Sequence, residues 1–231
     1  MIKSYTNGEW KEPGSLCQAI GVFKEGFAHH RTISVVGGGG KTTVIRKIMN
    51  ECRNEGIPCA VSTTTHIQKY DTEYFLGVPS VEMFRRIMLK YGVVWMGKET
   101  TDKKLTAFPD TYIKEISNEP GMLLLEADGA KRLPVKAPAE HEPVICAQTD
   151  IVLNVYGMSA VGKKLKDGCF RVKEMKQILG KTEEDILYPE DIVTLAVSQR
   201  AGRKCVADDM EYQVILNQAD TKERLEMAEW I

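Results

Sequence analysis

Four consecutive glycines followed by a lysine and two threonines, residues 37–43, constrain this chain more than any other feature. Residues 32–36, directly before them, favour a short β-strand, and the apolar positions after them recur at helical spacing. Gly56 stands where that helix is expected to end, and residues 57–62 favour a second strand. Strand, helix and strand in this order predict a right-handed βαβ unit with parallel strands.

A glycine loop between a strand and a helix favours phosphate binding for physical reasons. Glycine lets the backbone curl around an anion without Cβ clashes, the helix start adds a partial positive charge, and a lysine adds a full one. We expect Lys41 to reach the β- and γ-phosphates and the Thr42 hydroxyl to bind Mg²⁺. The residues expected to bind a nucleoside triphosphate, ATP or GTP, are Gly37, Gly38, Gly39, Gly40, Lys41, Thr42 and Thr43.

The loop departs from the common pattern Gly-x-x-x-x-Gly-Lys-Ser/Thr. That pattern needs a glycine where this chain has Val35. The run from Gly37 to Thr43 matches the shorter Gly-x-x-Gly-Lys-Thr-Thr, and in this it is similar to the ATP-dependent amide ligases of cell-wall synthesis. A flexible glycine turn would not account for the Lys-Thr-Thr that follows.

The rest of the chain alternates helical and strand patterns. Residues 122–127 form a continuous apolar run, as in a central strand buried on both faces. We therefore expect an α/β fold, three-layered and similar to P-loop NTPases, with a mainly parallel central sheet. The further expected helices cover 15–24, 81–91, 109–117 and one or two short stretches in 182–198, broken at Pro189; the further strands cover 93–96, 151–155 and 212–216.

The expected organisation is a tail over residues 1–14 and a single P-loop α/β domain over residues 15–231. The chain stops inside what its sequence predicts to be the helix after the last strand, so we expect a truncated C-terminus.

The net charge and the cysteine pattern limit the expected binding partners and the expected cellular compartment. The 31 basic and 32 acidic residues leave a net charge of −1, so neither a nucleic acid nor a membrane surface is an expected partner. The six cysteines include no Cys-x-x-Cys pair, and no apolar run is long enough to span a membrane. Because the N-terminus also lacks a signal peptide, we expect a cytoplasmic protein.

The segment Leu-Leu-Leu-Glu-Ala-Asp-Gly-Ala-Lys-Arg provides the second set of candidate residues. The strand is expected to deliver Glu126 and Asp128 to the carboxyl edge of the sheet, where open α/β sheets bind ligands. Asp128 would hold Mg²⁺, and either carboxylate could orient an attacking water. Lys131 and Arg132 would neutralise the charge that develops in phosphoryl transfer. Together with Lys41, these four residues are the predicted catalytic set.

Two further segments supply substrate candidates. The run Ser-Thr-Thr-Thr-His follows the second strand, so it is expected beside the phosphate loop, although consecutive threonines also suit a plain strand. Glu140-His141-Glu142-Pro143 is weak as a metal site, and a substrate role for its histidine is as plausible as a structural one. The substrate candidates are Thr64, Thr65, His66 and His141.

Asn217-Gln218-Ala219-Asp220, at the end of the last strand, resembles the Asn-Lys-x-Asp element of GTPases. Asp220 would pair with a guanine base and Asn217 would steady the loop. Gln218 replaces the lysine that packs over the base, which weakens the inference of guanine. A plain strand end remains the alternative.

Taken in order, VVGGGGKTT, STTTH, LLLEADGAKRLPVKAPAEHEPV and LNQAD resemble the YqeC family, accessory proteins of selenium-dependent molybdenum hydroxylases. The resemblance covers residues 16–220, and the second and third motifs are specific to the family. It implies a role in maturing hydroxylases that carry a labile selenium at their cofactor. The implied partners are an apo molybdenum hydroxylase or proteins of the selenium-donor pathway.

Three functions remain open on the sequence. The first is a Mg²⁺-dependent NTPase that couples phosphoryl chemistry to selenium or molybdenum-cofactor handling. The second is a small-molecule kinase or ligase of the P-loop class, and the third is a nucleotide-switched chaperone without its own substrate.

Overall fold

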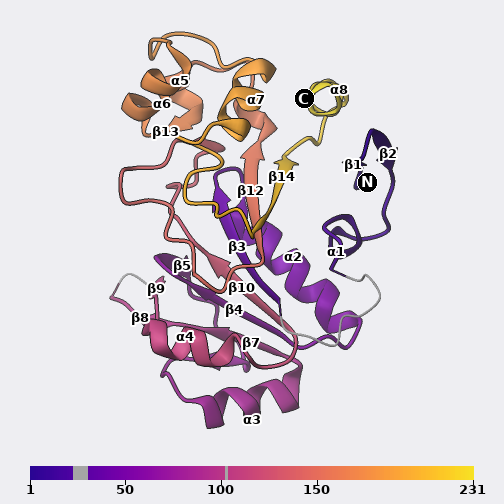
Figure 1. The fold of residues 1–231 in the computed structure, drawn as a ribbon, viewed down its shortest axis with the longest axis vertical. Coiled ribbons are helices and arrows are strands. Elements are labelled where there is room, and N and C mark those ends of the chain that lie inside the picture. The colour runs from indigo at the N-terminus through magenta and orange to yellow at the C-terminus, as the bar shows by residue number, and fades with distance from the viewer. Residues whose placement is uncertain (23–30, 102–103) are drawn as a thin grey trace. The chain divides into compact units, whose positions relative to one another are not determined.

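A parallel sheet of seven strands organises the chain, whose computed structural model describes residues 1–22, 31–101 and 104–231 (Figure 1). The hydrogen-bonding order is β14-β12-β3-β10-β4-β7-β6, and the sheet confirms the predicted α/β class. The strands are β3 (Arg31–Gly37), β4 (Cys59–Thr63), β6 (Phe75–Leu76), β7 (Val93–Met96), β10 (Met122–Glu126), β12 (Ile151–Gly157) and β14 (Glu211–Asn217).

Helices accompany this sheet, as a three-layer α/β fold requires. No helix of the described residues is both long and apolar enough to cross a membrane. The helices are α1 (Leu16–Ala19), α2 (Lys41–Asn54), α3 (Val81–Tyr91), α4 (Asp110–Ile116), α5 (Leu165–Gly168), α6 (Val172–Leu179), α7 (Pro189–Val197) and α8 (Lys222–Trp230), with a 3-10 turn η1 (Met158–Ala160).

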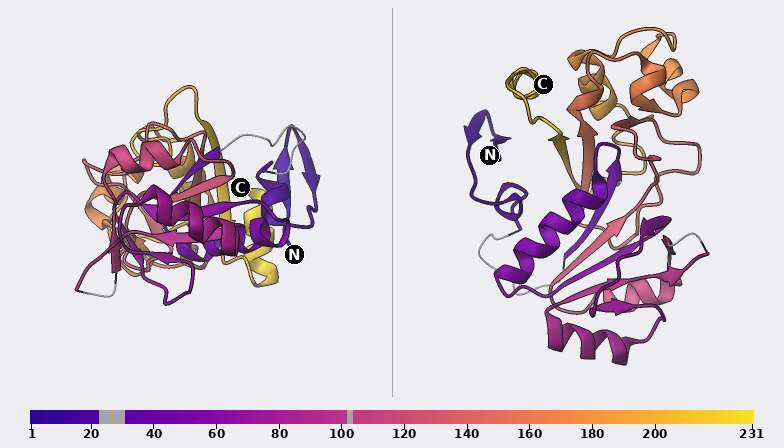
Figure 2. Two further views of the ribbon diagram at one scale, coloured as in Figure 1. Left: turned by 90° about the horizontal axis from the view of Figure 1, so that it is seen from below. Right: turned by 180° about the vertical axis from the view of Figure 1, so that it is seen from behind.

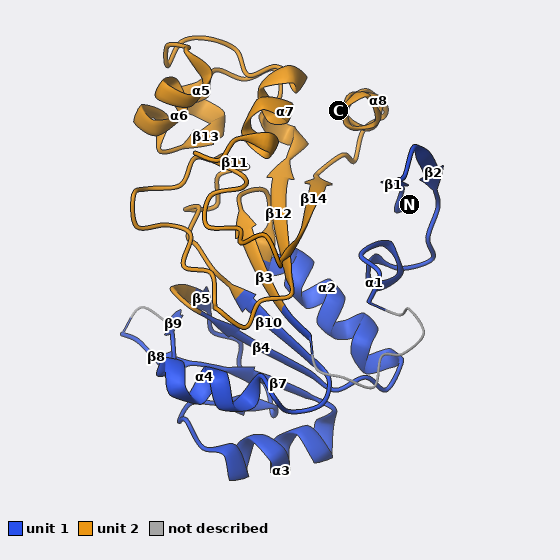
Figure 3. Cartoon of the chain, viewed as in Figure 1, with its two compact units in different colours: residues 1–32, 42–63, 67–125 blue, residues 33–41, 64–66, 126–231 orange. Residues whose placement is uncertain are grey.

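The chain divides into two compact units, coloured separately in Figure 3. Both contain several separate stretches of sequence, so each unit is assembled by tertiary contacts. Unit 1 comprises residues 1–32, 42–63 and 67–125, and unit 2 comprises residues 33–41, 64–66 and 126–231.

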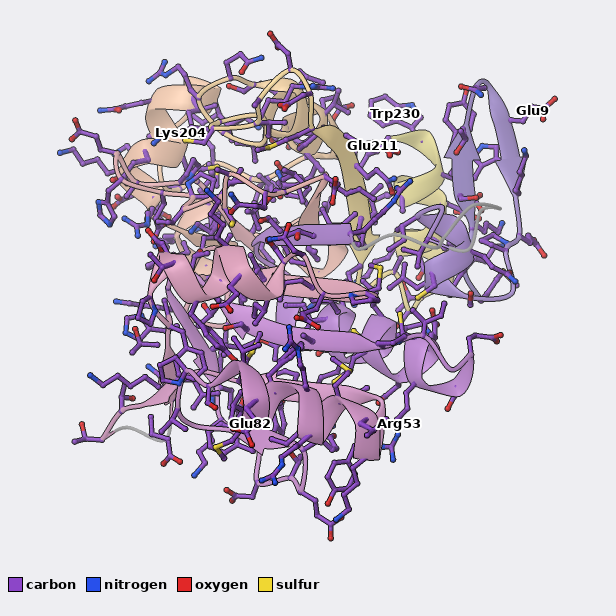
Figure 4. All side chains as sticks on the ribbon, turned by 60° about the horizontal axis from the view of Figure 1, so that its bottom comes forward. Glu9, Arg53, Glu82, Lys204, Glu211 and Trp230 are labelled. Carbon is purple, nitrogen blue, oxygen red and sulfur yellow. The ribbon has the colours of Figure 1, made fainter. Side chains whose placement is uncertain are left out.

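Unit 1 contains β4, α3, β7 and all of α2 except its first residue, Lys41; these segments are drawn in purple to magenta in Figure 2. The Ser80 side chain caps the start of α3, and Gly92, with a φ of 70°, ends the helix in the left-handed conformation. This helix packs on β7, whose four residues are buried. Charged side chains of α3 such as Glu82 are exposed (Figure 4).

The N-terminal residues of unit 1, expected as a tail, contain an antiparallel hairpin of β1 (Ser4–Thr6) and β2 (Glu9–Lys11). The helix expected over 15–24 is shorter, because Gly21, with a φ of 74°, follows the end of α1. Residues 23–24 of that prediction lie outside the described residues. Three short strands, β5 (His66–Gln68), β8 (Lys98–Glu99) and β9 (Lys104–Thr106), form a small sheet that the sequence did not predict.

Unit 2 contains the last two long strands, β12 and β14, with a helical cap built on them. The parallel pair β11 (Val135–Lys136) and β13 (Cys169–Phe170) also belongs to this unit. A buried apolar cluster holds α5, α6 and α7 to β11 and β12. Its members include Val135, Tyr156, Leu165, Met175, Ile192 and Leu195.

Residues 182–198 contain one helix in the structure. Pro189 is the first residue of α7, and Asp191 accepts a hydrogen bond from the Tyr188 backbone N–H at 2.7 Å. Proline suits this place because its missing N–H would have no helical partner there. The second helix considered for this stretch is wrong: residues 182–188 form a turn in which the Thr182 N–H donates to the Asp185 carboxylate.

Candidate functional site

The glycine loop of unit 2 has a backbone that only glycine adopts readily. Gly37, Gly39 and Gly40 have φ values of 94°, 65° and 102°. The loop also lies against neighbouring backbone, since a Cβ on Gly38 would lie 2.7 Å from Pro134 O. The glycines are therefore required both by conformation and by close packing.

Three of the loop amides are used to fasten the loop itself. The N–H of Gly37 donates to Asp128 Oδ2 at 2.9 Å, that of Gly38 to Val155 O at 2.9 Å, and that of Gly39 to Leu133 O at 3.2 Å. These donors face protein oxygens, whereas the sequence predicted that the loop amides face an anion.

Lys41 is buried at the end of this loop, with 4% of its surface exposed. Its Nζ donates to Gly37 O at 2.7 Å and lies 3.0 Å from Asp128 Oδ1. Glu126 Oε1 is 3.9 Å from the same nitrogen. The structure thus brings together the three predicted catalytic residues that are buried.

Asp128 connects the loop to the rest of the site, and its two oxygens have different partners. Oδ2 accepts from the Gly37 N–H and lies 3.0 Å from Lys136 Nζ. Oδ1 pairs with Lys41 but, within the described part of the chain, accepts no hydrogen bond of good geometry. Oδ2 therefore has one hydrogen-bond donor and one ion-pair partner, while Oδ1 has only an ion-pair partner.

Lys136 is the buried cation that sequence reasoning missed. Only 1% of its side chain is exposed, and its Nζ donates to Gly129 O at 2.8 Å and to Glu142 Oε2 at 2.5 Å. Glu142 Oε1 is in turn 2.8 Å from an Arg171 guanidinium nitrogen. A lysine next to apolar residues in the run Leu-Pro-Val-Lys-Ala was the available signal.

These contacts form a continuous chain of alternating charges, which we call the charge chain. It lies within unit 2, and each member is within ion-pair distance of the next. Such an arrangement lets buried charges be retained, because each one has an opposite partner. Its members are Lys41, Asp128, Lys136, Glu142 and Arg171.

Glu142 has a pKa below its ordinary value. Burial by itself raises the pKa, but the hydrogen bond and charge of Lys136 and the charge of Arg171 outweigh that effect. The carboxylate is therefore stabilised in the folded protein, so its contribution to stability is present above the unfolded pKa of about 4.3 and is lost as pH falls through the lower folded value.

Substitution of Glu142 by Gln should consequently change the pH dependence of stability. The free energy of unfolding should fall less steeply on acidification in Glu142→Gln than in the wild type. Thermal melting from about pH 7 to about pH 3 measures this, with Glu140→Gln, an exposed neighbour, as the control. If the free energy of unfolding fell equally steeply with pH in the wild type and in Glu142→Gln, the lowered pKa assigned to Glu142 would be contradicted.

The other predicted cations lie outside the charge chain. Lys131 and Arg132 are exposed, with left-handed backbone conformations at φ values of 46° and 65°. The Lys131 Nζ lies 5.4 Å from the centre of the Phe170 ring. His141 is also exposed, although it directly precedes the buried Glu142.

The residues of the Ser-Thr-Thr-Thr-His segment differ in their contacts and in their exposure. The Thr64 hydroxyl donates to Val144 O at 2.6 Å, and its backbone N–H donates to Glu126 O at 3.1 Å. Thr64 therefore fastens the end of β10 in place. Thr65 is half-buried, and His66 is exposed in β5.

At the end of β14, the Asn217 side chain donates from Nδ2 to Gly39 O at 2.7 Å. This contact joins the end of β14 to the glycine loop. Gln218 adopts a φ of 61° and its side chain bonds to Ser159, whereas Asp220 is exposed.

Thr42 and Thr43 continue α2, where Thr42 is half-buried and Thr43 is exposed. No group of three His, Cys, Asp or Glu side chains among the described residues is arranged to hold a metal ion. A site for Mg²⁺ made of a single carboxylate and the phosphates of a ligand is the type that this ion commonly uses.

Comparison with known proteins places the chain in a family. The profile described as YqeC protein matches residues 33–173, which include the glycine loop and the whole charge chain. The chain is also 28% identical over 169 residues to the uncharacterized protein YqeC of Escherichia coli strain K12; the match covers 71% of this chain and 66% of that relative, just under two thirds. No solved structure matches. Because the family profile covers more than half of the sequence, the chain belongs to the YqeC protein family.

Proposed function

We propose that this YqeC family member binds a Mg²⁺–nucleoside triphosphate at the glycine loop and hydrolyses it. The observation that carries the proposal is the buried Lys41, held between the loop carbonyl of Gly37 and the carboxylate of Asp128. A buried lysine at the start of a 14-residue helix, directly after four glycines, is a cation positioned for phosphate.

The residues present fit such a ligand. Since the amides of Gly37, Gly38 and Gly39 are bonded to protein oxygens, a phosphate would draw on Lys41 and on the amides that follow. Asp128 Oδ1, which accepts no good hydrogen bond among the described residues, is the oxygen suited to a metal ion or its water. Bound Mg²⁺ would neutralise charge on the phosphates, and Asp128 or Glu126 would orient the attacking water.

Lys41→Ala should abolish tight binding of the triphosphate. The substitution removes a charge-assisted contact, so we expect affinity to fall roughly a hundredfold, or ~3 kcal/mol. Calorimetric titration with ATP, GTP and CTP, each with Mg²⁺, measures this and identifies the base. Lys163→Ala, which changes an exposed lysine of the same unit, should bind like the wild type. Wild-type protein that binds none of the three nucleotides would refute the proposal.

The cellular role that we propose is maturation of selenium-dependent molybdenum hydroxylases. The support is the family membership together with the motifs that resemble these accessory proteins. In native cells lacking the chain, activity of the selenium-dependent hydroxylase should be lost and should return with the wild-type gene but not with Lys41→Ala. If Lys41→Ala also restored hydroxylase activity, the cellular role would not require nucleotide binding at the glycine loop.

A further inference from the structure

Lys41 and Lys136 bind the same carboxylate from opposite sides. Lys41 Nζ lies 3.0 Å from Asp128 Oδ1, and Lys136 Nζ lies 3.0 Å from Asp128 Oδ2. All three side chains are almost completely buried, so water screens these attractions weakly. Two cations that share one anion each reduce its attraction for the other.

Lys41 would have to leave Asp128, at least in part, to bind a triphosphate. The energy of that departure depends on how much of the Asp128 charge is balanced from the other side. Lys136 provides this balance without being free to follow Lys41, because it also donates to Gly129 O and Glu142 Oε2.

We propose that Lys136 is a positioning residue that sets how strongly Asp128 retains Lys41, and hence the affinity of the loop for a triphosphate. Glu142 acts one step further away, by drawing Lys136 away from Asp128. This inference rests on the proposed function, since it assumes that Lys41 is the group that meets the phosphate.

The proposal predicts effects of opposite sign for two neighbouring substitutions. Lys136→Met leaves Asp128 with Lys41 alone, so Lys41 is retained more strongly and a nearby positive charge is lost. Glu142→Gln leaves Lys136 with Asp128 as its one anionic partner, so Lys41 is released more easily. A purely structural role would weaken binding in both variants, because both disturb the same buried contacts.

The experiment is a titration of each full-length variant with ATP and GTP, first in EDTA and then with Mg²⁺. We expect Lys136→Met to bind about tenfold more weakly than wild type, or ~1.4 kcal/mol, and Glu142→Gln to bind about threefold more tightly. The same order of the three proteins is expected in both conditions. Lys163→Met and Glu140→Gln, both at exposed positions of unit 2, are the matched controls and should equal the wild type.

The inference would be overturned if the wild type bound triphosphate and the two variants either both bound it more weakly or both bound it as well as the wild type. Either result would leave the proposed function standing. Wild type that binds no triphosphate would overturn the proposed function first. If Lys136→Met does not fold, the tighter binding of Glu142→Gln tests the inference alone, since loss of a structural contact does not raise affinity.

Discussion

Asp128→Ala is expected to be among the most damaging single substitutions in this chain. It leaves Lys41 without its nearest carboxylate and Lys136 with Glu142 alone, and it removes the acceptor of the Gly37 N–H. Breaking a buried ion pair by removing one partner typically costs 3–5 kcal/mol, so we expect destabilisation of about that size.

Urea denaturation of Asp128→Ala, with Asp209→Ala as the exposed control, measures this effect. Asp128→Asn should be less destabilising, because its side-chain oxygen can still accept from Gly37 N–H, yet it should also lose the Mg²⁺ dependence of triphosphate binding. Stability of Asp128→Ala equal to that of Asp209→Ala would mean that the charge chain contributes nothing to folding.

Gly39→Ala should have the second large effect, and unit 2 offers a control that isolates its cause. Gly39 and Gly180 have nearly the same φ, 65° and 67°. A Cβ on Gly39 would lie 2.5 Å from Gly157 Cα and would also meet Gly157 N, whereas one on Gly180 would meet nothing within 4 Å. The conformational cost of about 1–2 kcal/mol is therefore shared, and only Gly39→Ala adds steric overlap.

We expect Gly39→Ala to be less stable than Gly180→Ala by roughly 1–3 kcal/mol, the usual cost of overpacking. It should also bind triphosphate poorly, since the loop would have to move away from Gly157. Chemical denaturation of both variants and nucleotide titration measure the two effects. Equal losses of stability in Gly39→Ala and Gly180→Ala would show that backbone conformation alone accounts for the need for glycine at position 39.

Much of the fold was predictable because its signals are local. The strand before the glycine run, the helix after it and the apolar strand predicted over 122–127 each follow from residues close together in sequence. The structure confirms all three, with the last strand ending at Glu126. The small sheet of β5, β8 and β9 was not predicted. Strands of two or three residues are too short to show a period, and they are defined by distant pairing.

The sequence by itself determined the glycine loop, its lysine and the carboxylates that follow a buried strand. It could not indicate which of four basic residues, Lys131, Arg132, Lys136 and Arg171, would pair with buried carboxylates in the fold. Lys131 and Arg132 stand closer in sequence to Asp128 but are exposed, whereas Lys136 and Arg171 enter the charge chain. The reason is the pairing of β11 with β13, which sets Lys136 opposite Phe170 and so brings the neighbouring Arg171 to Glu142.

Burial of a lysine depends on whether tertiary contacts supply it with anions. Here those contacts depend on the pairing of β11 with β13, whose partner residues are 34 positions apart, and a local pattern cannot reveal that pairing. The glycine loop therefore identified where a phosphate would bind. Only the folded unit 2 decided which charges surround Lys41, because Asp128, Lys136, Glu142 and Arg171 meet through strand pairing and loop closure.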